Sequence, residues 1–469
     1  MSVVTNTTTI GAIELPSRRN TELLLLGFAV VISMFAYANA GLAISGEFPP
    51  GMLLYGLGLG ALAGIAHLVV RRYAKYADPL LLPVATLLNG MGLVLIWRLD
   101  QSKRLQNSKN FVEAAPRQLL YTALAIALFA GVLLVLKDHR VLQRFTYISM
   151  VVALVLLILP VIPGLGADVF GAKIWISVGG FSIQPGEFAK IVIAVFFAGY
   201  LMVKRDALAL ASRRFMGLYL PRGRDLGPIL MIWAMSLLVL VFENDLGTSL
   251  LFFGMFVIML YVATERTSWI VIGLLMSVGG AAVVGSTASH VKVRVTAWLD
   301  PFDCYYTSGA CQQVGQSIMS FGSGGVLGTG WGQGNSDLIG FAANSDFIFS
   351  TVGEELGLTG VMAFLLLYGL IIERGVRTAL AARDPFGKLF AIGLSGAFTL
   401  QIFVVAGGVM GLIPLTGMTM PFLAYGGSSV LANWMLVGIL IRISDTARRP
   451  APAPAPSPDS EMTQVVRPS

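Results

Sequence analysis

The sequence predicts an all-α polytopic membrane protein, and its composition and hydropathy are the observations that predict it. Only 12% of the 469 residues are charged and 56% are hydrophobic, with a mean hydropathy of +0.78. A chain of this composition cannot present a charged surface to water on all sides. Its apolar runs are about 17 to 24 residues long, enough to cross a hydrocarbon core about 30 Å thick. A soluble enzyme with a single anchor is therefore excluded.

Twelve segments meet this requirement, and we expect each to form a transmembrane helix. In chain order they are 23–44, 51–70, 79–97, 118–136, 145–162, 186–203, 226–242, 246–263, 268–286, 356–373, 388–410 and 426–443. An even number of spans places both termini on one side of the membrane. Most Lys and Arg then fall in segments on that side, which is typical of the cytoplasm. The loop from Arg98 to Arg117 is an exception, because it carries five positive charges on the opposite side.

The formal net charge of +7 does not indicate a nucleic-acid partner. The basic residues lie in short loops between spans rather than in one stripe or patch, and membrane insertion explains them better.

Three regions interrupt the helical pattern. Segment 163–185 is rich in Gly, so we expect it to fold back onto the bundle instead of spanning. Segment 287–349 is the longest connection, and long connections carry function. The tail after Arg449 contains APAPAPSP, which is typical of a polyproline-like disordered extension. It is either a solubilising end or a docking handle for a cytoplasmic partner.

Cys304 and Cys311 are the two cysteines of the chain, and both lie in the long connection. A disulfide between them is expected if this loop faces an oxidising compartment. Two free thiols are the alternative. A metal site there is not expected, since only His290 is near.

Ionisable residues at or inside the membrane are the first candidates for function, because an unpaired charge there costs several kcal/mol. Glu187 and Lys190 stand three apart at the start of a span, so they share one face of a helix. They are either functional or a satisfied structural ion pair. Asp245, in ENDLGTS, either serves the site or caps the following helix.

The long connection brings cations, acids and Gly-rich backbone together. Lys292 and Arg294 precede Asp300 and Asp303, and a Gly-rich run follows. Such a set suits a diphosphate, with an acid left to handle a proton. An ordinary solvated loop is the alternative.

Two further segments complete the pattern. ANSDFIFSTVGEELGLTG (343–360) carries three acids into the next span, and GLIPLTGMTMPFLAYGGSS (411–429) is uncharged and broken by Pro and Gly. Irregular backbone at membrane depth is tolerated only where it lines a cavity or is buried in protein.

Five segments of the chain follow one another as GAKIWISVGGFSIQPGEFAK, ENDLGTS, RVTAWLDPFD with QSIMSFGSGG, NSDFIFSTVGEELGLTG, and GLIPLTGMTMPFLAYGGSS. In this order they resemble the signature blocks of the SEDS family (shape, elongation, division and sporulation), which includes RodA, FtsW and SpoVE. GSGGVLGTGW and GLIPLTG resemble the RodA branch more closely.

The resemblance implies a domain organisation. It indicates a cytoplasmic segment 1–22, extra N-terminal spans with their following loop in 23–110, a SEDS-like core in 111–445 with its large extracytoplasmic loop at 287–349, and a disordered cytoplasmic tail in 446–469. The family usually has ten spans, so the chain resembles the family core with two spans added at the N terminus.

The resemblance also implies an activity. It indicates a bacterial cell-membrane enzyme that polymerises lipid II into β-1,4 glycan strands, in elongation or division. Its implied partners are a class B penicillin-binding protein and other membrane proteins of the elongation or division complex. The donor sugar is α-linked and the product β-linked, so one inverting displacement suffices, with undecaprenyl diphosphate as the leaving group.

The site residues follow from the same resemblance. The essential acid carries over to Asp303, with Asp300 in reserve, because Cys304 to Cys311 occupy a stretch where relatives are shorter. The implied substrate-binding residues are Lys173, Trp175, Gln184, Glu187, Lys190, Asp245, Lys292, Arg294, Ser345, Asp346, Glu354 and Ser428. A divalent cation, Mg or Mn, is a further candidate for the leaving diphosphate. No organic cofactor is expected.

Two other classes of protein remain open. A polyprenyl-linked precursor flippase or transporter also needs broken helices, buried ion pairs and a cavity. A non-catalytic scaffold would leave Asp303 and Glu187 without a purpose.

Overall fold

A computed structural model of the chain describes residues 17–105, 112–169, 172–178, 181–210, 213–215, 218–220, 234 and 245–450. Within these ranges, eleven helices are long and apolar enough to cross a membrane. They correspond to eleven of the twelve predicted spans. The remaining one, 226–242, lies outside the described residues except for residue 234. The chain is a multi-pass, mainly helical membrane protein.

The elements before the long connection have the following bounds. They are α1 (Arg19–Ser45), α2 (Met52–Tyr73), α3 (Leu81–Leu105), α4 (Ala115–Val135), the 3-10 helix η1 (His139–Phe145), α5 (Thr146–Ile158), η2 (Leu159–Val161), β1 (Gly166–Val169), β2 (Ala172–Val178), β3 (Phe181–Ile183), α6 (Pro185–Leu210), β4 (Arg213–Phe215), β5 (Leu218–Leu220), α8 (Leu246–Thr264) and α9 (Ser268–Thr287). The later elements are α10 (Ser289–Leu299), α11 (Gly309–Gly324), η3 (Ser336–Ile339), α12 (Ile348–Ala381), α13 (Pro385–Val409) and α14 (Gly427–Arg448).

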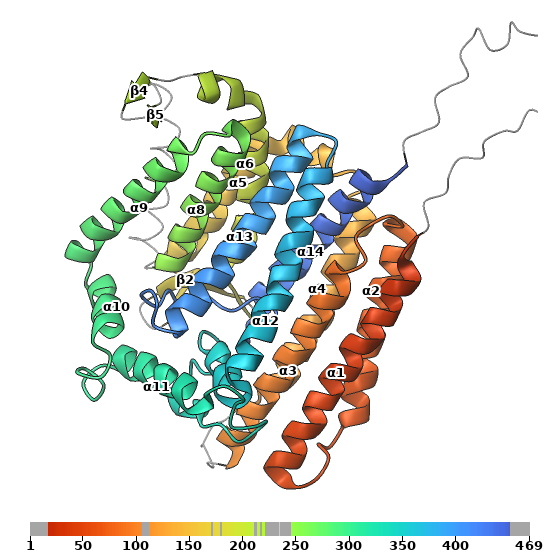
Figure 1. Cartoon of the computed structure of the whole chain (residues 1–469), viewed down its shortest axis with the longest axis vertical. Coiled ribbons are helices and arrows are strands. Elements are labelled where there is room, and N and C mark those ends of the chain that lie inside the picture. Colours follow the sequence, from red (N-terminus) through yellow and green to blue (C-terminus); the bar gives the residue numbers. More distant parts are fainter. Residues whose placement is uncertain are drawn as a thin grey trace, which may run out of the picture.

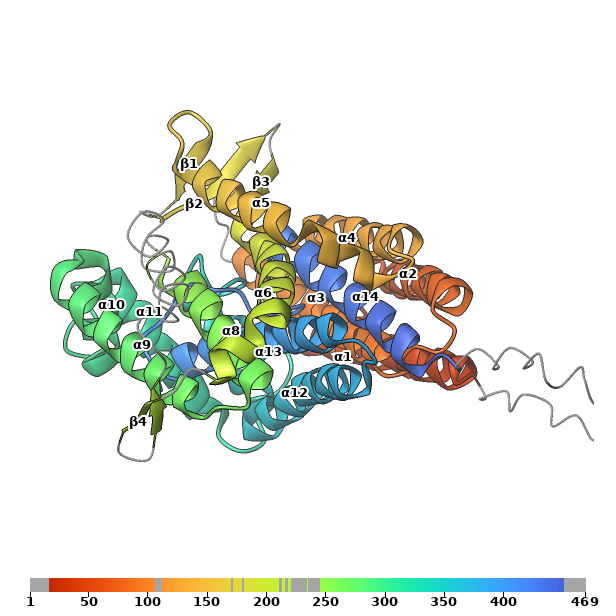
Figure 2. The same ribbon diagram turned by 90° about the horizontal axis from the view of Figure 1, so that it is seen from above.

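The centre of the bundle is made by α3, α6, α13 and α14, which are the most buried of the eleven spans. Figure 2 shows α14 in the interior, with α1 and α2 at one edge and α9, α10 and α11 at the opposite edge. The start of α1 and the end of α14 lie at one end of the bundle, whereas α10 and α11 lie toward the other (Figure 1). We call the latter the loop end.

The Gly-rich segment before α6 forms a small antiparallel sheet of order β1-β2-β3. Its register pairs Ala167 with Trp175 and Ser177 with Ser182. β2 packs against η2 and against α6. The sheet was not predicted, because three strands this short carry almost no hydropathy signal. It delivers the chain directly into the first turn of α6.

The long connection 287–349 contains three helices, α10, α11 and η3, instead of irregular loop alone. α11 buries Cys311, Val314 and Ser317 along one face, which seats it on the loop end. Both α10 and α11 are too short to cross a membrane. They give the connection a defined structure.

α12 begins at Ile348, eight residues before the predicted span, and breaks its helical geometry at Gly357, where φ is +63°. The break lets the α12 backbone pair with the Gly-rich run, because Leu358 N–H donates to the Gly325 carbonyl oxygen at 2.9 Å. A Cβ on Gly357 would lie 2.6 Å from the Val326 carbonyl oxygen. Only glycine meets both requirements.

We therefore expect Gly357→Ala to lower the stability of the folded protein by about 1 to 3 kcal/mol, since it combines an unfavourable φ with a backbone clash. Gly369→Ala is the matched control, because it lies on the same helix and its added Cβ meets nothing within 4 Å. Thermal unfolding in detergent measures both. Equal midpoints for the two variants would contradict this account of the break.

Candidate active site

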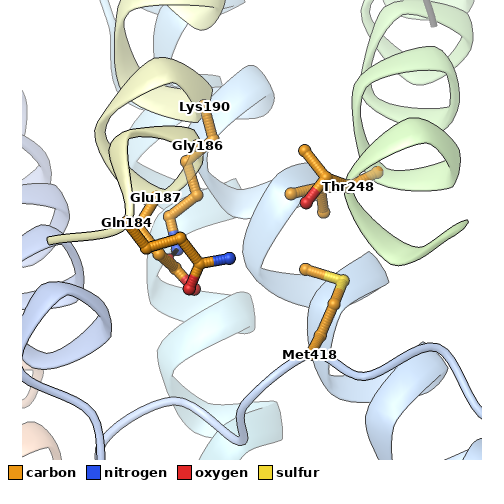
Figure 3. A pocket seen from close by; sticks show the side chains of 7 residues that line it. Gln184, Gly186, Glu187, Lys190, Thr248 and Met418 are labelled. Carbon is orange, nitrogen blue, oxygen red and sulfur yellow. Dashed lines mark hydrogen bonds and ion pairs between the residues drawn. The ribbon is translucent and has the colours of Figure 1, made fainter. Parts of the chain in front are cut away.

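A small pocket lies where α6 and α8 meet the segment between α13 and α14. Its lining consists of Gln184, Gly186, Glu187, Lys190, Thr248, Leu251 and Met418. Figure 3 shows Gln184, Glu187 and Lys190 on one side, with Thr248 and Met418 facing them. The pocket has room for little more than a water molecule, so as it stands it would hold only a small part of a large lipid substrate.

The charged wall of the pocket is the pair predicted on one face of α6. Lys190 Nζ lies 2.6 Å from Glu187 Oε2. Two buried amides complete its surroundings, since Nζ also donates to Gln401 Oε1 on α13 at 2.9 Å and to Asn433 Oδ1 on α14 at 3.2 Å. An ammonium has three N–H donors, so all the donors of Lys190 are used within the bundle.

Residues 411–426, between α13 and α14, form an irregular segment that we call the strap. It is held at its carbonyl oxygens by side chains from several helices. Gln401 Nε2 donates to Thr419 O at 2.9 Å, Tyr368 Oη to Pro421 O at 2.6 Å, and Gln118 Nε2 to Ala424 O at 3.1 Å. The strap thus meets the rule that non-helical backbone at membrane depth needs protein partners.

A second polar cluster, formed by Asp245, Arg294 and Asp346, adjoins the pocket. Arg294 Nη1 donates to Thr416 O of the strap at 2.9 Å. Asp245 is the N-cap of α8, where its side chain accepts a hydrogen bond from Thr248 N at 3.0 Å. It therefore caps the helix, as one of the two alternatives for this residue expected.

Electrostatics couple the two acids of this cluster. Burial raises the pKa of Asp346 to about 6, Arg294 opposes the rise, and Asp245 adds to it. Burial also raises the pKa of Asp245, against its hydrogen bonds with Thr248 and the charge of Arg294. The charge of Arg294 therefore acts on both acids, and Asp346 holds its proton more readily than an ordinary aspartate.

Some of the predicted site residues lie near the pocket, through neighbours of its lining. Ser428 Oγ accepts from Gln184 N at 2.8 Å, which joins the start of α14 to the start of α6. Ser345 precedes Asp346 in the chain, and its hydroxyl donates to the Ala342 carbonyl oxygen at 3.4 Å.

Other predicted residues lie elsewhere. Lys173 and Trp175 are on β2, and Lys292 is exposed on α10. Glu354 Oε1 accepts from Asn335 N at 2.8 Å, so this acid holds the Gly-rich run against α12. These residues do not line the pocket.

Asp300 and Asp303 lie in the turn between α10 and α11, and both are exposed. The turn is at the outer edge of the loop end (Figure 1), and neither aspartate lines the pocket. A disulfide joins Cys304 of the turn to Cys311 of α11, with 5.6 Å between the Cα atoms. The bond encloses the segment that begins one residue after Asp303.

Sequence reasoning missed five residues of the site, among them Leu251 of the apolar part of α8. Thr248 and Met418 stand inside the motifs ENDLGTS and GLIPLTGMTM but were not singled out. Gln401 and Asn433 were missed because they are uncharged. An amide in the middle of an apolar span was nevertheless a signal, because it needs a partner there.

A sequence model described as "Cell cycle protein", for FtsW, RodA and SpoVE, matches residues 78–449. The chain belongs to the FtsW/RodA/SpoVE family. The match includes α3 to α14 and leaves α1 and α2 before it.

Curated relatives from two branches of the FtsW/RodA/SpoVE family are similar to most of the chain. It is 48% identical over 437 residues to "Peptidoglycan glycosyltransferase RodA" of Mycobacterium leprae, covering 93% of this chain and 92% of the relative. It is 33% identical to "Stage V sporulation protein E" of Bacillus subtilis, covering 79% of this chain and 98% of that one.

Solved structures share the fold of this family member. Thermus thermophilus rod shape determining protein RodA superposes with a TM-score of 0.54 at 22% identity, covering 80% of this chain and 98% of that one. A chain described under "Structural coordination of polymerization and crosslinking by a peptidoglycan synthase complex" superposes with a TM-score of 0.53 at 22% identity, covering 84% and 98%.

We expect Glu187 and Lys190 to be energetically coupled. Removing one member leaves a buried charge without its partner, at a cost of about 3 to 5 kcal/mol. Glu187→Ala and Lys190→Ala should each be severe, and the double variant no worse than the worse single. Thermal unfolding of the four proteins gives the coupling, and strictly additive losses would reject it.

The disulfide gives a separate chemical prediction. Alkylation of unreduced protein should leave Cys304 and Cys311 unmodified, and mass spectrometry should find both modified only after reduction. Replacing both by Ser should lower stability by about 2 to 3 kcal/mol for a loop this short. Two alkylated thiols without reduction would show that the bond does not form.

Proposed function

We propose that the chain is a peptidoglycan glycosyltransferase that polymerises lipid II into β-1,4 glycan strands. The observation that carries the proposal is 48% identity, across 93% of the chain, to a RodA of that name. The pocket supports it, since it combines a buried charge pair with a polar wall at the junction of three elements.

The chemistry requires a base for the acceptor hydroxyl and positive charge for the leaving diphosphate. We assign the base to Asp303, with Asp300 in reserve. Glu187 and Asp245 are already engaged, the first with Lys190 and the second as a helix cap. Asp303 is exposed and could meet a substrate hydroxyl at the loop end.

The contacts of the cations refine the roles that the sequence indicates. Lys190 uses all its donors inside the bundle, and Arg294 holds the strap. Lys292 and Lys173 are exposed. We therefore assign the diphosphate charge to these two lysines, and we regard Glu187 and Lys190 as the pair that shapes the pocket.

A divalent cation is a proposal that rests on the chemistry of the leaving diphosphate alone. Among the residues that the structure describes, no group of three or more His, Cys, Asp or Glu could hold a metal ion. The carboxylates beside the pocket are already shared with Lys190 and Arg294. These residues do not fit a resident metal site, so no step is assigned to one.

We place both termini in the cytoplasm and the loop end on the outer face of a bacterial cell membrane. Positive residues at the end of the bundle where α1 starts and α14 ends support this orientation. Arg71 and Arg72, which are exposed in the last turn of α2, are examples.

The partner we propose is a class B penicillin-binding protein, together with other membrane proteins of the elongation or division complex. A structural neighbour described as coordinating polymerization and crosslinking in a peptidoglycan synthase complex supports the proposal.

Purified protein given fluorescent lipid II tests the function against its alternatives. The enzyme makes glycan strands. A flippase would move lipid II across a liposome membrane without making strands, and a scaffold would do neither. Absence of strands, with or without the partner, would reject the proposal.

The same assay tests the base. We expect Asp303→Asn to lower the polymerisation rate by about 10² to 10⁴, because the amide cannot accept the proton. Its exposed side chain predicts normal folding. Glu47→Gln, an exposed acid between α1 and α2, is the matched control and should keep full activity. Full activity of Asp303→Asn with none in Asp300→Asn would transfer the role to Asp300.

A further inference from the structure

The strap is held from two sides at neighbouring carbonyl oxygens. From inside the bundle, Gln401 donates to Thr419 O at 2.9 Å while it accepts from Lys190 Nζ at the same distance. From the loop end, Arg294 donates to Thr416 O at 2.9 Å. Between these two points Met418 lines the pocket. The part of the strap that lines the pocket therefore lies between its contact with Gln401 and its contact with Arg294.

α10 has a second attachment to the strap. Trp298 Nε1 donates to Gly411 O at 2.9 Å. Arg294 and Trp298 are four residues apart, so they lie on one face of α10. Both bind backbone carbonyls of the same segment, and α10 ends one residue later, at the turn that carries Asp300 and Asp303.

The middle of the strap contacts α8 and α10 at adjacent residues. A Cβ on Gly247 of α8 would lie 2.7 Å from the Met418 sulfur, and one on Gly417, where φ is +77°, would lie 3.4 Å from Arg294 Nη2. Residues 416–418 of the strap thus lie against α8 on one side and against Arg294 of α10 on the other.

From this geometry we propose that the strap couples the Glu187–Lys190 pocket to the α10–α11 turn, with Arg294 and Trp298 as positioning residues. Occupation of the pocket sets the place of Met418, and the two α10 side chains carry that change to the turn. The inference deepens the proposed function, because it rests on Asp303 or Asp300 acting from that turn. It assigns Arg294 a role in position rather than in diphosphate charge.

Hydrogen–deuterium exchange tests the coupling without any need for catalysis. The probe is undecaprenyl diphosphate at saturating concentration in detergent. In the unaltered protein it should slow exchange in peptides covering 184–190 and also in 299–308. In Trp298→Phe, which loses only the indole N–H, the slowing at 184–190 should persist and that at 299–308 should fall at least threefold.

Two further variants complete the set. Arg294→Lys keeps the charge but loses the planar donor geometry, so it should behave like Trp298→Phe. Thr296→Ala is the matched control, because Thr296 is exposed on the same helix, and it should behave like the unaltered protein. A thermal midpoint near that of the unaltered protein verifies that Trp298→Phe is folded.

Each other outcome overturns the coupling. Slowing at 299–308 that survives in both variants, or that never occurs in the unaltered protein, shows that the strap does not transmit. Loss of slowing at 184–190 in the variants shows that Arg294 and Trp298 are needed for binding of the probe and not for transmission to the turn. No slowing at 184–190 in any protein shows that the probe does not occupy the pocket.

Kinetics separate this inference from the proposed function. If the chain polymerises lipid II, Trp298→Phe should lower kcat about tenfold with KM unchanged, because the pocket still binds while the turn is misplaced. A protein that makes no glycan but shows the exchange pattern would keep the coupling and reject the enzyme. Unchanged kcat in a polymerising protein would reject the coupling alone.

Discussion

The ammonium of Lys190 is the constraint on which the centre of the bundle depends. A charge at this depth is costly unless all its donors are met. The three acceptors come from its own helix, from α13 and from α14. Because each bond has a narrow range of length and angle, the three helices have one relative position in which the charge is satisfied. The pocket is a consequence of that position.

The backbone of the strap also needs partners for its polar groups. A helix satisfies its own carbonyls, whereas an irregular segment cannot. The polar side chains of otherwise apolar helices, such as Gln118, Tyr368 and Gln401, are therefore placed to serve the strap. Phe422, with φ of +64°, is held in a conformation uncommon for a bulky residue. The strap is shaped by its neighbours and not by its own propensities.

The site divides into a rigid inner part and an exposed outer part. The inner part is the pocket, whose charges are paired and whose backbone is held on all sides. The outer part is the turn with Asp300 and Asp303, restrained by a disulfide and attached through α10. This division suits a reaction in which a lipid-linked donor is held in the membrane and the proton is handled at its surface.

The sequence by itself determined the membrane spans, since an apolar run of sufficient length has no other stable place. It also determined local relations, such as Glu187 facing Lys190 one turn away. It did not reveal the strands before α6 or the helices α10 and α11, because all of these are too short to appear as apolar runs of membrane-spanning length. Only the tertiary structure decided that Lys190 meets Gln401, 211 residues further along the chain, and that Arg294 meets Thr416, 122 residues further. Hydropathy determines which segments lie in the membrane. Which helices pack against one another, and how each is rotated about its axis, is determined by side-chain contacts between segments far apart in the sequence.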